Sequence, residues 1–396
     1  MAMFGGAGGA GGAGGAGGAG GAGGAGGAGG AGGAGTGLTG LGSFLGAGAV
    51  PVYDPITTQG LMTSAEAIAH VAGVATPPPF THRPFNDPQN LTQVADWVRA
   101  SNYFTRFFAR TRIVPMGGEV HIGFAPTATA PTAQSPFPSD PMVRVGVVGR
   151  PSAGDFVAQL AYLRNYADQR PDRAAEITSQ LGFPTPYFLM LLAAHPGRNR
   201  HLVELITAAQ VITAHVAMAV KAPLAVQRPD QIDATIMPMI PTPGHGAYPS
   251  AHATEAFAAC RVLEGVIADP DLTNAFPDRD RTLALVRAQA ARIAVNRTVA
   301  GVHYPLDSWA GAALGTMIGE IVLGLCGIAA DVRPFAYATQ TLQNPGAIDF
   351  SLHRFTDPTK HAAAGLTHSD ALPGPVTPEP AFVWLWSKMV KDFTGA

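Results

Sequence analysis

Apolar residues recur at helical spacing through most of the chain after residue 155. They fall largely at positions i, i+3, i+4 and i+7, and proline, glycine or aspartate interrupts the pattern between stretches. Strand signals are scarce in the same region, so we expect an all-α fold built as a helical bundle. The pattern predicts helices over Phe156–Ala167, Arg173–Leu181, Pro186–Ala194, Asn199–Ala222, Ser250–Ala268, Arg279–Val299 and Leu306–Ala329.

Outside this region the pattern is weaker. It predicts a core helix within Asn90–Arg110, a short helix near Ser64–Val74 and a terminal helix over Pro380–Phe393. The stretch Ile113–Val148 is punctuated by glycine and proline, and the residues Met142–Val147 alternate in polarity. That alternation is typical of a short hairpin, although irregular loops fit it as well.

Two of the stretches, Leu202–Val220 and Ala310–Ala330, are long and apolar enough to raise the question of a membrane span. The first contains Glu204 and His215, the second contains Glu320, and small residues are frequent in both. Charged and ionisable groups are rare in lipid-exposed helices. We therefore expect central helices of the bundle and no integral membrane insertion.

The chain begins with a low-complexity segment of ten tandem Gly-Gly-Ala triplets. Such a segment has almost no side chains to bury and does not build a core. It is either a flexible tail or an association strand of a homo-oligomer, since its period of three matches a polyproline II helix. We expect a repeat tail over residues 1–37, a Gly/Pro-rich extended arm over 38–85, and an all-helical domain over 86–396 that holds the site within 221–307.

Composition narrows the possible functions. Charged residues make up 13% of the chain and the formal net charge is −2, which argues against a nucleic-acid partner. Cys260 and Cys326 lie in apolar helical stretches without a CxxC spacing, so we expect buried thiols. The first residues lack the basic and apolar pattern of a signal peptide, which favours a cytoplasmic location as an expectation.

Candidate chemistry is concentrated in three short stretches: KAPLAVQRP over Lys221–Pro229, YPSAH over Tyr248–His252, and RTVAGVHYPLD over Arg297–Asp307. Ser250 precedes an apolar-periodic run, so it is expected to cap a helix whose first N–H groups are free to bind an anion. Most such helix ends bind nothing. The basic residues nearby must find partners, and a bound tetrahedral oxyanion is one.

Two histidines are candidates for a chemical role. His252 lies in the first turn of the predicted helix, where the macrodipole favours a neutral imidazole, although a lone histidine there is usually structural. Asp307 follows His303 by four residues, so its carboxylate is expected to reach a ring nitrogen and fix the tautomer.

The ordered pattern Lys-x6-Arg-Pro, Pro-Ser-x-His and Arg-x5-His-x3-Asp resembles the signature of the type 2 phosphatidic acid phosphatase and vanadium-dependent haloperoxidase superfamily. The resemblance implies the helical bundle of that family. It also implies that His303 is the axial ligand of vanadate or the nucleophile toward phosphorus, that His252 is the acid or base, and that Asp307 orients His303.

The same resemblance assigns the groups that bind the oxyanion. Lys221, Arg228 and Arg297 would neutralise the equatorial oxygens, while Ser250 and the backbone N–H of Ala251 would donate hydrogen bonds. In two places the chain departs from the family pattern. Ala251 stands where glycine is usual, and Asn296 stands where serine is common.

Two reactions suit this pocket, because vanadate and the transition state of phosphoryl transfer share shape and charge. The stretch AYPSAHAT and His245 resemble the haloperoxidase version of the site. We therefore expect a vanadate-dependent oxidation of bromide or iodide by hydrogen peroxide, in which Lys221 polarises the peroxo ligand. The alternative is a soluble acid phosphatase that uses no cofactor and hydrolyses a phosphate monoester through a phosphohistidine at His303. A structural role with a vestigial pocket is a third hypothesis.

Overall fold

The computed structural model describes residues 55–72, 81–130, 132, 135, 139–340 and 342–395. The Gly-Gly-Ala tail and the proposed association strand lie outside these residues. The chain divides into two compact units, Met1–Asn102 and Tyr103–Ala396, which are described separately.

The first unit contains helix α4 (Pro55–Ala72), the 3-10 helix η1 (Pro88–Gln93) and the start of α5 (Asp96–Phe108). The side chain of Asp87 caps η1 by accepting a hydrogen bond from the backbone N–H of Gln89 at 2.9 Å. Helices are thus confirmed both near Ser64 and within Asn90–Arg110.

In the second unit, the seven predicted helices and the terminal helix are confirmed, with ends shifted by a few residues. They are α6 (Ala153–Tyr166), α7 (Arg170–Ser179), α8 (Thr185–Leu191), α9 (Arg200–Leu224), α11 (Ala251–Ala268), α12 (Arg279–Val299), α13 (Pro305–Leu325) and α16 (Pro380–Thr394). Short helices not predicted from the sequence are α10 (Pro229–Ile232), α14 (Leu352–Thr356), α15 (Pro358–His361), η2 (Ala167–Gln169), η3 (Ala234–Ile236), η4 (Pro270–Leu272), η5 (Pro345–Ala347) and η6 (Ala362–Ala364).

The expectation of an all-α fold is wrong in part, because the unit also contains a five-stranded sheet of order β2-β3-β4-β5-β6. The strands are β2 (Thr111–Met116), β3 (Glu119–Phe124), β4 (Val143–Gly149), β5 (Phe335–Tyr337) and β6 (Leu366–His368). All neighbours pair antiparallel except β4 and β5, which pair parallel with Gly146 opposite Phe335. β5 and β6 have three residues each, so neither is long enough to show the alternation of polarity that identifies a strand in sequence.

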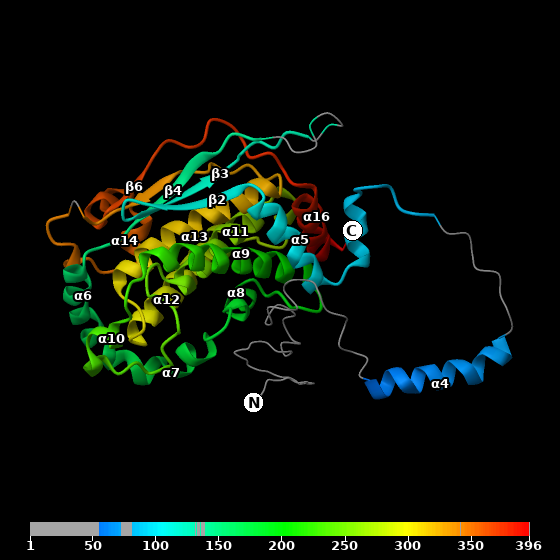
Figure 1. Ribbon diagram of the computed structural model, residues 1–396, viewed down its shortest axis with the longest axis horizontal. Helices are drawn as coiled ribbons and strands as arrows, with labels where there is room; N and C mark the ends of the chain where they lie inside the picture. Colours follow the sequence, from blue (N-terminus) through cyan, green and yellow to red (C-terminus); the bar gives the residue numbers. More distant parts are fainter. Residues whose placement is uncertain are drawn as a thin grey trace. The chain divides into compact units, whose positions relative to one another are not determined.

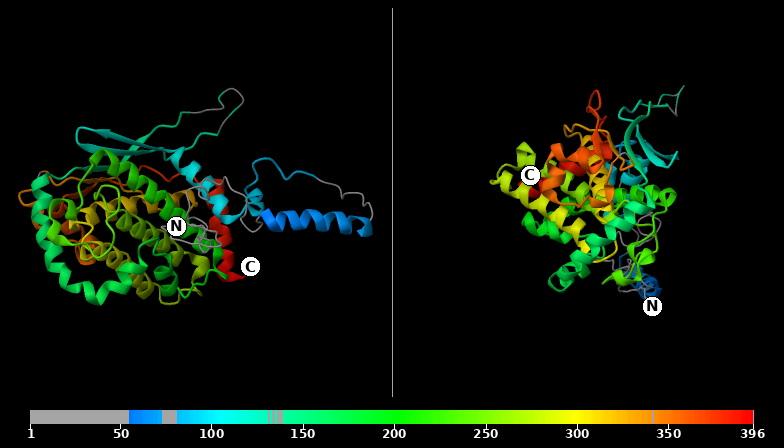
Figure 2. Two further views of the ribbon diagram at one scale, coloured as in Figure 1. Left: turned by 60° about the horizontal axis from the view of Figure 1, so that its bottom comes forward. Right: turned by 90° about the vertical axis from the view of Figure 1, so that its left-hand side faces the viewer.

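Helix α11 lies at the centre of the helical layer and packs against α9, α12 and α13. The sheet runs along one side of this layer, where it contacts α9 and α13 (Figures 1 and 2). The free thiols of Cys260 and Cys326 are both buried in this layer, as expected.

Two stretches of the described residues are long and apolar enough to cross a membrane: Arg200–Ile232, of which 72% is buried in its most apolar window, and Pro305–Leu325, of which 89% is buried. Burial inside the protein accounts for their apolar character. The expectation of central helices is confirmed, and the absence of membrane insertion stays a prediction.

Helix α13 approaches α11 closely along three glycines spaced four residues apart: Gly311, Gly315 and Gly319. A Cβ atom at Gly315 would lie 2.2 Å from the carbonyl oxygen of Thr254 and 3.0 Å from the backbone nitrogen of Ala258. Both obstacles are backbone atoms, which cannot move aside as a flexible side chain would. The glycines therefore set the distance between the two helices.

We expect Gly315→Ala to lower the free energy of unfolding by about 1–3 kcal/mol or more, because the added methyl group forces α11 and α13 apart. Denaturant titration followed by circular dichroism measures the change. Gly182→Ala is the matched control, since a Cβ atom there meets nothing within 4 Å. An unchanged unfolding midpoint for Gly315→Ala would contradict this account of the helix packing.

Candidate functional site

The structure brings the residues of the three stretches together at the ends of five helices. Lys221 lies in the last turn of α9, and Arg228 immediately precedes α10. Arg297 lies in the last turn of α12, and His303 lies in the turn that leads into α13. The N-terminus of α11 joins this group, because the backbone N–H of Ser250 donates to the carbonyl oxygen of Asp307 at 2.9 Å.

His303 is held in one tautomer from both sides. Its Nδ1 lies 2.7 Å from the Asp307 carboxylate, and its Nε2 lies 3.0 Å from Nη1 of Arg228. A guanidinium only donates hydrogen bonds, so Nε2 must be the accepting nitrogen and Nδ1 carries the proton that is donated to Asp307. The expected contact between His303 and Asp307 is confirmed, and a buried lone pair on Nε2 faces the cations.

The Asp307 carboxylate also accepts the backbone N–H of Tyr304 at 3.0 Å. Burial raises the pKa of Asp307, and the cations of Lys221 and Arg228 together with the Tyr304 N–H oppose that rise. Burial, with the positive charges of Arg228 and Lys221, lowers the pKa of His303 well below its ordinary value. The ring is therefore neutral at neutral pH when no anion is bound.

Lys221 is 2% exposed, and its Nζ donates to the carbonyl oxygens of Gly246 at 2.8 Å and Ala247 at 2.7 Å. Burial and the nearby Arg228 lower the pKa of Lys221 to about 7. Two of its three N–H bonds are used in this way. Within the described part of the chain, the third has no protein acceptor and is available to a ligand.

Arg228 is 1% exposed and joins three segments through its guanidinium. Nη1 donates to the carbonyl oxygen of Val302 at 2.7 Å, and Nε donates to that of His245 at 2.9 Å. Nη2 lies 3.1 Å from Nδ1 of His245, which is itself 3.1 Å from the carbonyl oxygen of Gly246. Nδ1 serves only one of these two partners in a given tautomer, because the first donates and the second accepts.

His245 is the most exposed of the candidate residues and lies at the edge of the cluster. Partial burial and the cations of Lys221 and Arg228 lower its pKa to about 4. The structure thus connects His245 to the site through Arg228. Its influence on the choice of reaction stays a prediction.

Ser250 caps α11, as expected. Its hydroxyl oxygen accepts the backbone N–H of Ala253 at 3.3 Å, so its own O–H remains free to donate. The backbone N–H of Thr254 donates to the carbonyl oxygen of Ser250. The first-turn N–H groups of Ala251 and His252 have no acceptor within the helix and form the positive end of its dipole. Ala251 is 7% exposed, so its methyl group is buried.

Arg297 and His252 are both held by the C-terminal end of α7. Nη2 of Arg297 donates to Oε1 of Gln180 at 3.1 Å and to the carbonyl oxygen of Ile177 at 3.3 Å. Nε2 of His252 lies 2.7 Å from the carbonyl oxygen of Gln180. The Nε of Arg297 is buried without a hydrogen-bond partner among the described residues. Burial lowers the pKa of Arg297 to about 10, and burial with the charge of Arg297 lowers that of His252 to about 3.

Glu255 is a charged residue of this cluster that the sequence analysis missed. It lies one turn after His252 on α11 and is 6% exposed. Burial raises the pKa of Glu255 to about 8, and the nearby Lys221 and Arg297 oppose that rise. A carboxyl group in an otherwise apolar helical stretch was the available sequence signal.

The turn between α12 and α13 is fixed from outside the cluster. Gly301 adopts φ +85°, which favours glycine, and a Cβ atom there would lie 2.7 Å from Nη2 of Arg170. Arg170 donates to the carbonyl oxygens of Val299 at 2.9 Å, Ile236 at 3.0 Å and Met237 at 2.8 Å. This role of Arg170 could not be predicted, because Arg170 lies far from Gly301 in the chain.

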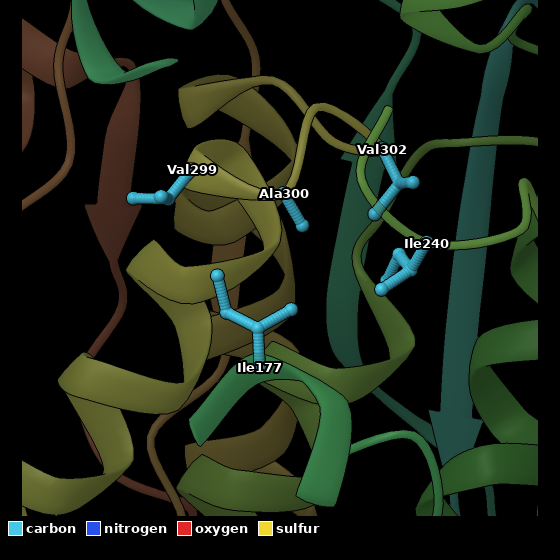
Figure 3. Packing of buried hydrophobic residues seen from close by; sticks show 5 residues of the cluster. All are labelled: Ile177, Ile240, Val299, Ala300 and Val302. Carbon is cyan, nitrogen blue, oxygen red and sulfur yellow. The ribbon is translucent and has the colours of Figure 1, made fainter. Parts of the chain in front are cut away.

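An apolar cluster packs beside the same turn. Figure 3 shows its members, which come from α7, from the loop before α11, and from the end of α12 with the turn that follows it: Ile177, Ile240, Val299, Ala300 and Val302. This packing ties α7 to the backbone between Arg297 and His303. Among the described residues, no group of three or more histidine, cysteine, aspartate or glutamate side chains is arranged to hold a metal ion.

Residues 201–327, which include every residue from Lys221 to Asp307, match the family model of the PAP2 superfamily. A decaprenylphosphoryl-5-phosphoribose phosphatase of Mycobacterium tuberculosis is 33% identical over 135 residues, covering 34% of this chain and 67% of the relative. Among solved structures, a transmembrane PAP2 type phosphatidylglycerolphosphate phosphatase from Bacillus subtilis covers 42% of this chain and 84% of its own, with a TM-score of 0.34 and 17% identity. The family match and the phosphatase relative show that the chain belongs to the PAP2 superfamily and is an enzyme of this phosphatase superfamily.

Proposed function

We propose that the protein is a phosphatase that hydrolyses a phosphate ester through a phosphohistidine at His303. The observation that carries this proposal is the fixed tautomer of His303, whose Nε2 lone pair lies 3.0 Å from the guanidinium of Arg228. A neutral imidazole with a bare nitrogen is a competent nucleophile toward phosphorus. The surrounding cations supply the charge that a phosphoryl group needs.

Charge complementarity supports an oxyanion as the ligand. Lys221, Arg228 and Arg297 are each 2% exposed or less, and buried cations are unfavourable unless paired. A phosphate group with two negative charges would pair with them and accept the free donors of Lys221 and of Arg297. The Ser250 hydroxyl and the Ala251 N–H complete the set of donors that we assign to the phosphoryl oxygens.

In the first step, the Nε2 lone pair of His303 forms a bond to phosphorus while the bond between phosphorus and the ester oxygen breaks. The proton on Nδ1 stays with the Asp307 hydrogen bond, which offsets the positive charge that develops on the ring. His252 gives a proton to the departing oxygen. The negative charge of the bound phosphoryl group raises the pKa of His252 above its value of about 3 without ligand, so that it can carry this proton.

In the second step, a water molecule attacks the phosphohistidine and the bond between Nε2 and phosphorus breaks. His252 accepts the proton from water, which returns it to its starting form, and inorganic phosphate leaves. No oxidant or reductant takes part. Arg228 would then regain its hydrogen bond to Nε2 of His303.

The comparisons favour this phosphatase over the haloperoxidase that the sequence analysis expected. The named relative is a phosphatase, and no comparison supports vanadium, peroxide or halide chemistry for this chain. The same cations fit vanadate, which mimics the transition state of phosphoryl transfer, so we expect vanadate to act as an inhibitor. Decaprenylphosphoryl-5-phosphoribose, named for the relative, is one substrate to assay beside a simple phosphate monoester.

We expect His303→Ala to lower kcat/KM for hydrolysis of p-nitrophenyl phosphate by at least about a thousandfold, because the nucleophile is removed. Release of p-nitrophenol measures the rate. His201→Ala is the matched control, since His201 is also buried and lies 2.9 Å from Asp392 but belongs to no part of the site. Retention of activity in His303→Ala would contradict the proposed nucleophile.

Orthovanadate separates the two reactions of the superfamily. We expect vanadate to inhibit hydrolysis by the wild-type protein competitively and to produce no oxidation of bromide or iodide by hydrogen peroxide. Halogenation of monochlorodimedone by the vanadate-loaded protein, with no phosphate release from esters, would instead establish the haloperoxidase.

The raised pKa of Glu255 can be tested in the protein without a ligand. Its pKa is about 8 in the folded protein against an ordinary value of 4.5, so the folded state holds a proton that the unfolded state loses between these two values. Stability therefore falls as pH rises from about 5 to 8. We expect Glu255→Gln to remove this loss and to be more stable than the wild type at pH 8. Between pH 5 and pH 8, the free energy of unfolding of Glu255→Gln should rise relative to that of the wild type by on the order of 2 kcal/mol.

Thermal unfolding in phosphate-free buffer at several pH values measures this effect. Glu66→Gln, at an exposed position of α4, is the control and should show no gain that grows with pH. A stability difference between Glu255→Gln and the wild type that stays constant from pH 5 to 8 would show that Glu255 does not carry the raised pKa.

A further inference from the structure

Gln180 contacts two of the candidate residues although it lies outside the three stretches that carry the family pattern. It is the C-cap residue of α7 and is fully buried. Its carbonyl oxygen binds the ring of His252, and its side-chain oxygen binds Arg297. One residue thus reaches both the proposed acid and one of the cations.

The orientation of the Gln180 amide is fixed by a chain of hydrogen bonds. Nη1 of Arg173 donates to Oδ1 of Asn296 at 3.0 Å, so the Asn296 amide nitrogen must face away from Arg173. That nitrogen donates to Oε1 of Gln180 at 3.0 Å. Arg297 donates to the same oxygen at 3.1 Å. An arginine stands at each end of this series of hydrogen bonds, and arginines only donate. A flipped Gln180 amide would therefore place its NH2 group against two donors, the amide of Asn296 and the guanidinium of Arg297.

The bond to His252 fixes a tautomer as well. A carbonyl oxygen only accepts, so Nε2 of His252 carries a proton and donates it to Gln180 at 2.7 Å. In the neutral ring, Nδ1 is therefore the nitrogen that exchanges protons with substrate and water. The C-terminal end of α7 thus determines which ring nitrogen of His252 is available for proton transfer.

Gln180 is itself held in place by its neighbours. Ile177, three residues earlier, is buried in the apolar cluster beside the turn of Gly301, and Arg170 at the start of α7 binds three carbonyl oxygens around that turn. Asn296 is also fully buried and stands where serine is common in the family pattern. Asn296 and Gln180 thus form a buried polar contact beside the site.

We propose that Gln180 is a positioning residue that holds Arg297 against the bound oxyanion through its side chain and holds His252 in the Nε2–H tautomer through its carbonyl oxygen. This inference rests on the proposed function, since it requires that the site bind an oxyanion. Its side-chain part is tested by binding and its backbone part by spectroscopy.

The binding experiment measures the affinity of the purified full-length protein for orthovanadate by isothermal titration calorimetry. Gln180→Met keeps the length of the side chain and removes its hydrogen bonds. We expect it to weaken vanadate binding by roughly 10-fold or more, which corresponds to losing one hydrogen bond to a charged group. Gln210→Met is the matched control. Gln210 is equally buried and accepts a hydrogen bond from Thr185 at 2.6 Å, but it lies outside the site. The Nε2 atoms of Gln180 and Gln210 are both buried without a hydrogen-bond partner among the described residues.

The control should lose thermal stability and keep the wild-type affinity. Equal affinities of Gln180→Met and the wild type would overturn the inference while leaving the proposed function intact. A wild-type protein that does not bind vanadate would overturn the proposed function and this inference with it.

A double-mutant cycle separates positioning from general loss of structure. If Gln180 acts through Arg297, adding Gln180→Met to Arg297→Ala should weaken vanadate binding by less than about twofold beyond Arg297→Ala alone. If the double variant loses affinity by the product of the two single fold-changes, Gln180 does not act through Arg297.

The tautomer is measured in the wild-type protein, and a variant, His252→Asn, is used only to assign the signal of the ring. In 15N-histidine-labelled protein at neutral pH, we expect the His252 ring, assigned by its absence in His252→Asn, to give a protonated Nε2 and a bare Nδ1. A protonated Nδ1 with a bare Nε2 would overturn the inference.

Discussion

The close approach of α11 and α13 is the constraint on which the site depends. The glycines of α13 remove the side chains that would separate the two helices, and Gly311 lies directly against the carbonyl oxygen of Ser250. The N-termini of both helices therefore meet, and the backbone of Ser250 bonds to that of Asp307. The N-terminus of α11, capped by Ser250, and the pair of His303 and Asp307 become neighbours because the two helix axes come close to each other.

Buried charges of both signs are concentrated at the candidate site. Lys221, Arg228 and Arg297 are buried, while Asp307 and Glu255 are the acids near them. Each acid has its pKa raised by burial, and each histidine of the cluster has its pKa lowered. Under the proposed function, a bound phosphoryl group would oppose the positive charges around His252 and so raise its pKa, which would couple ligand binding to proton uptake by His252.

Much of the helical core could be predicted from the sequence, because its helices are long and their apolar periodicity is local. The sheet could be predicted only in part: a hairpin was expected within Ile113–Val148, where most of β2, β3 and β4 lies, but β5 and β6 are too short to show a period, and they join the sheet by pairing of β5 with β4 and of β6 with β5. Lys221, Ser250 and His303 were recognisable from spacing, and the contact of His303 with Asp307 followed from their separation by one helical turn. Gln180 and Arg170 were not recognisable, because only folding brings α7 to the turn at Gly301. Glu255 was predictable in principle, because a carboxyl group stands out in the apolar sequence of α11.

The parallel pairing of β4 with β5 joins two segments that are far apart in the sequence. The core helices from α6 to α13 are all contained in the loop between two adjacent strands, with Gly146 opposite Phe335. Closing so long a loop is entropically unfavourable until the helices within it have packed. The pairing of β4 with β5 is therefore expected to form late in folding, after the helical core has packed.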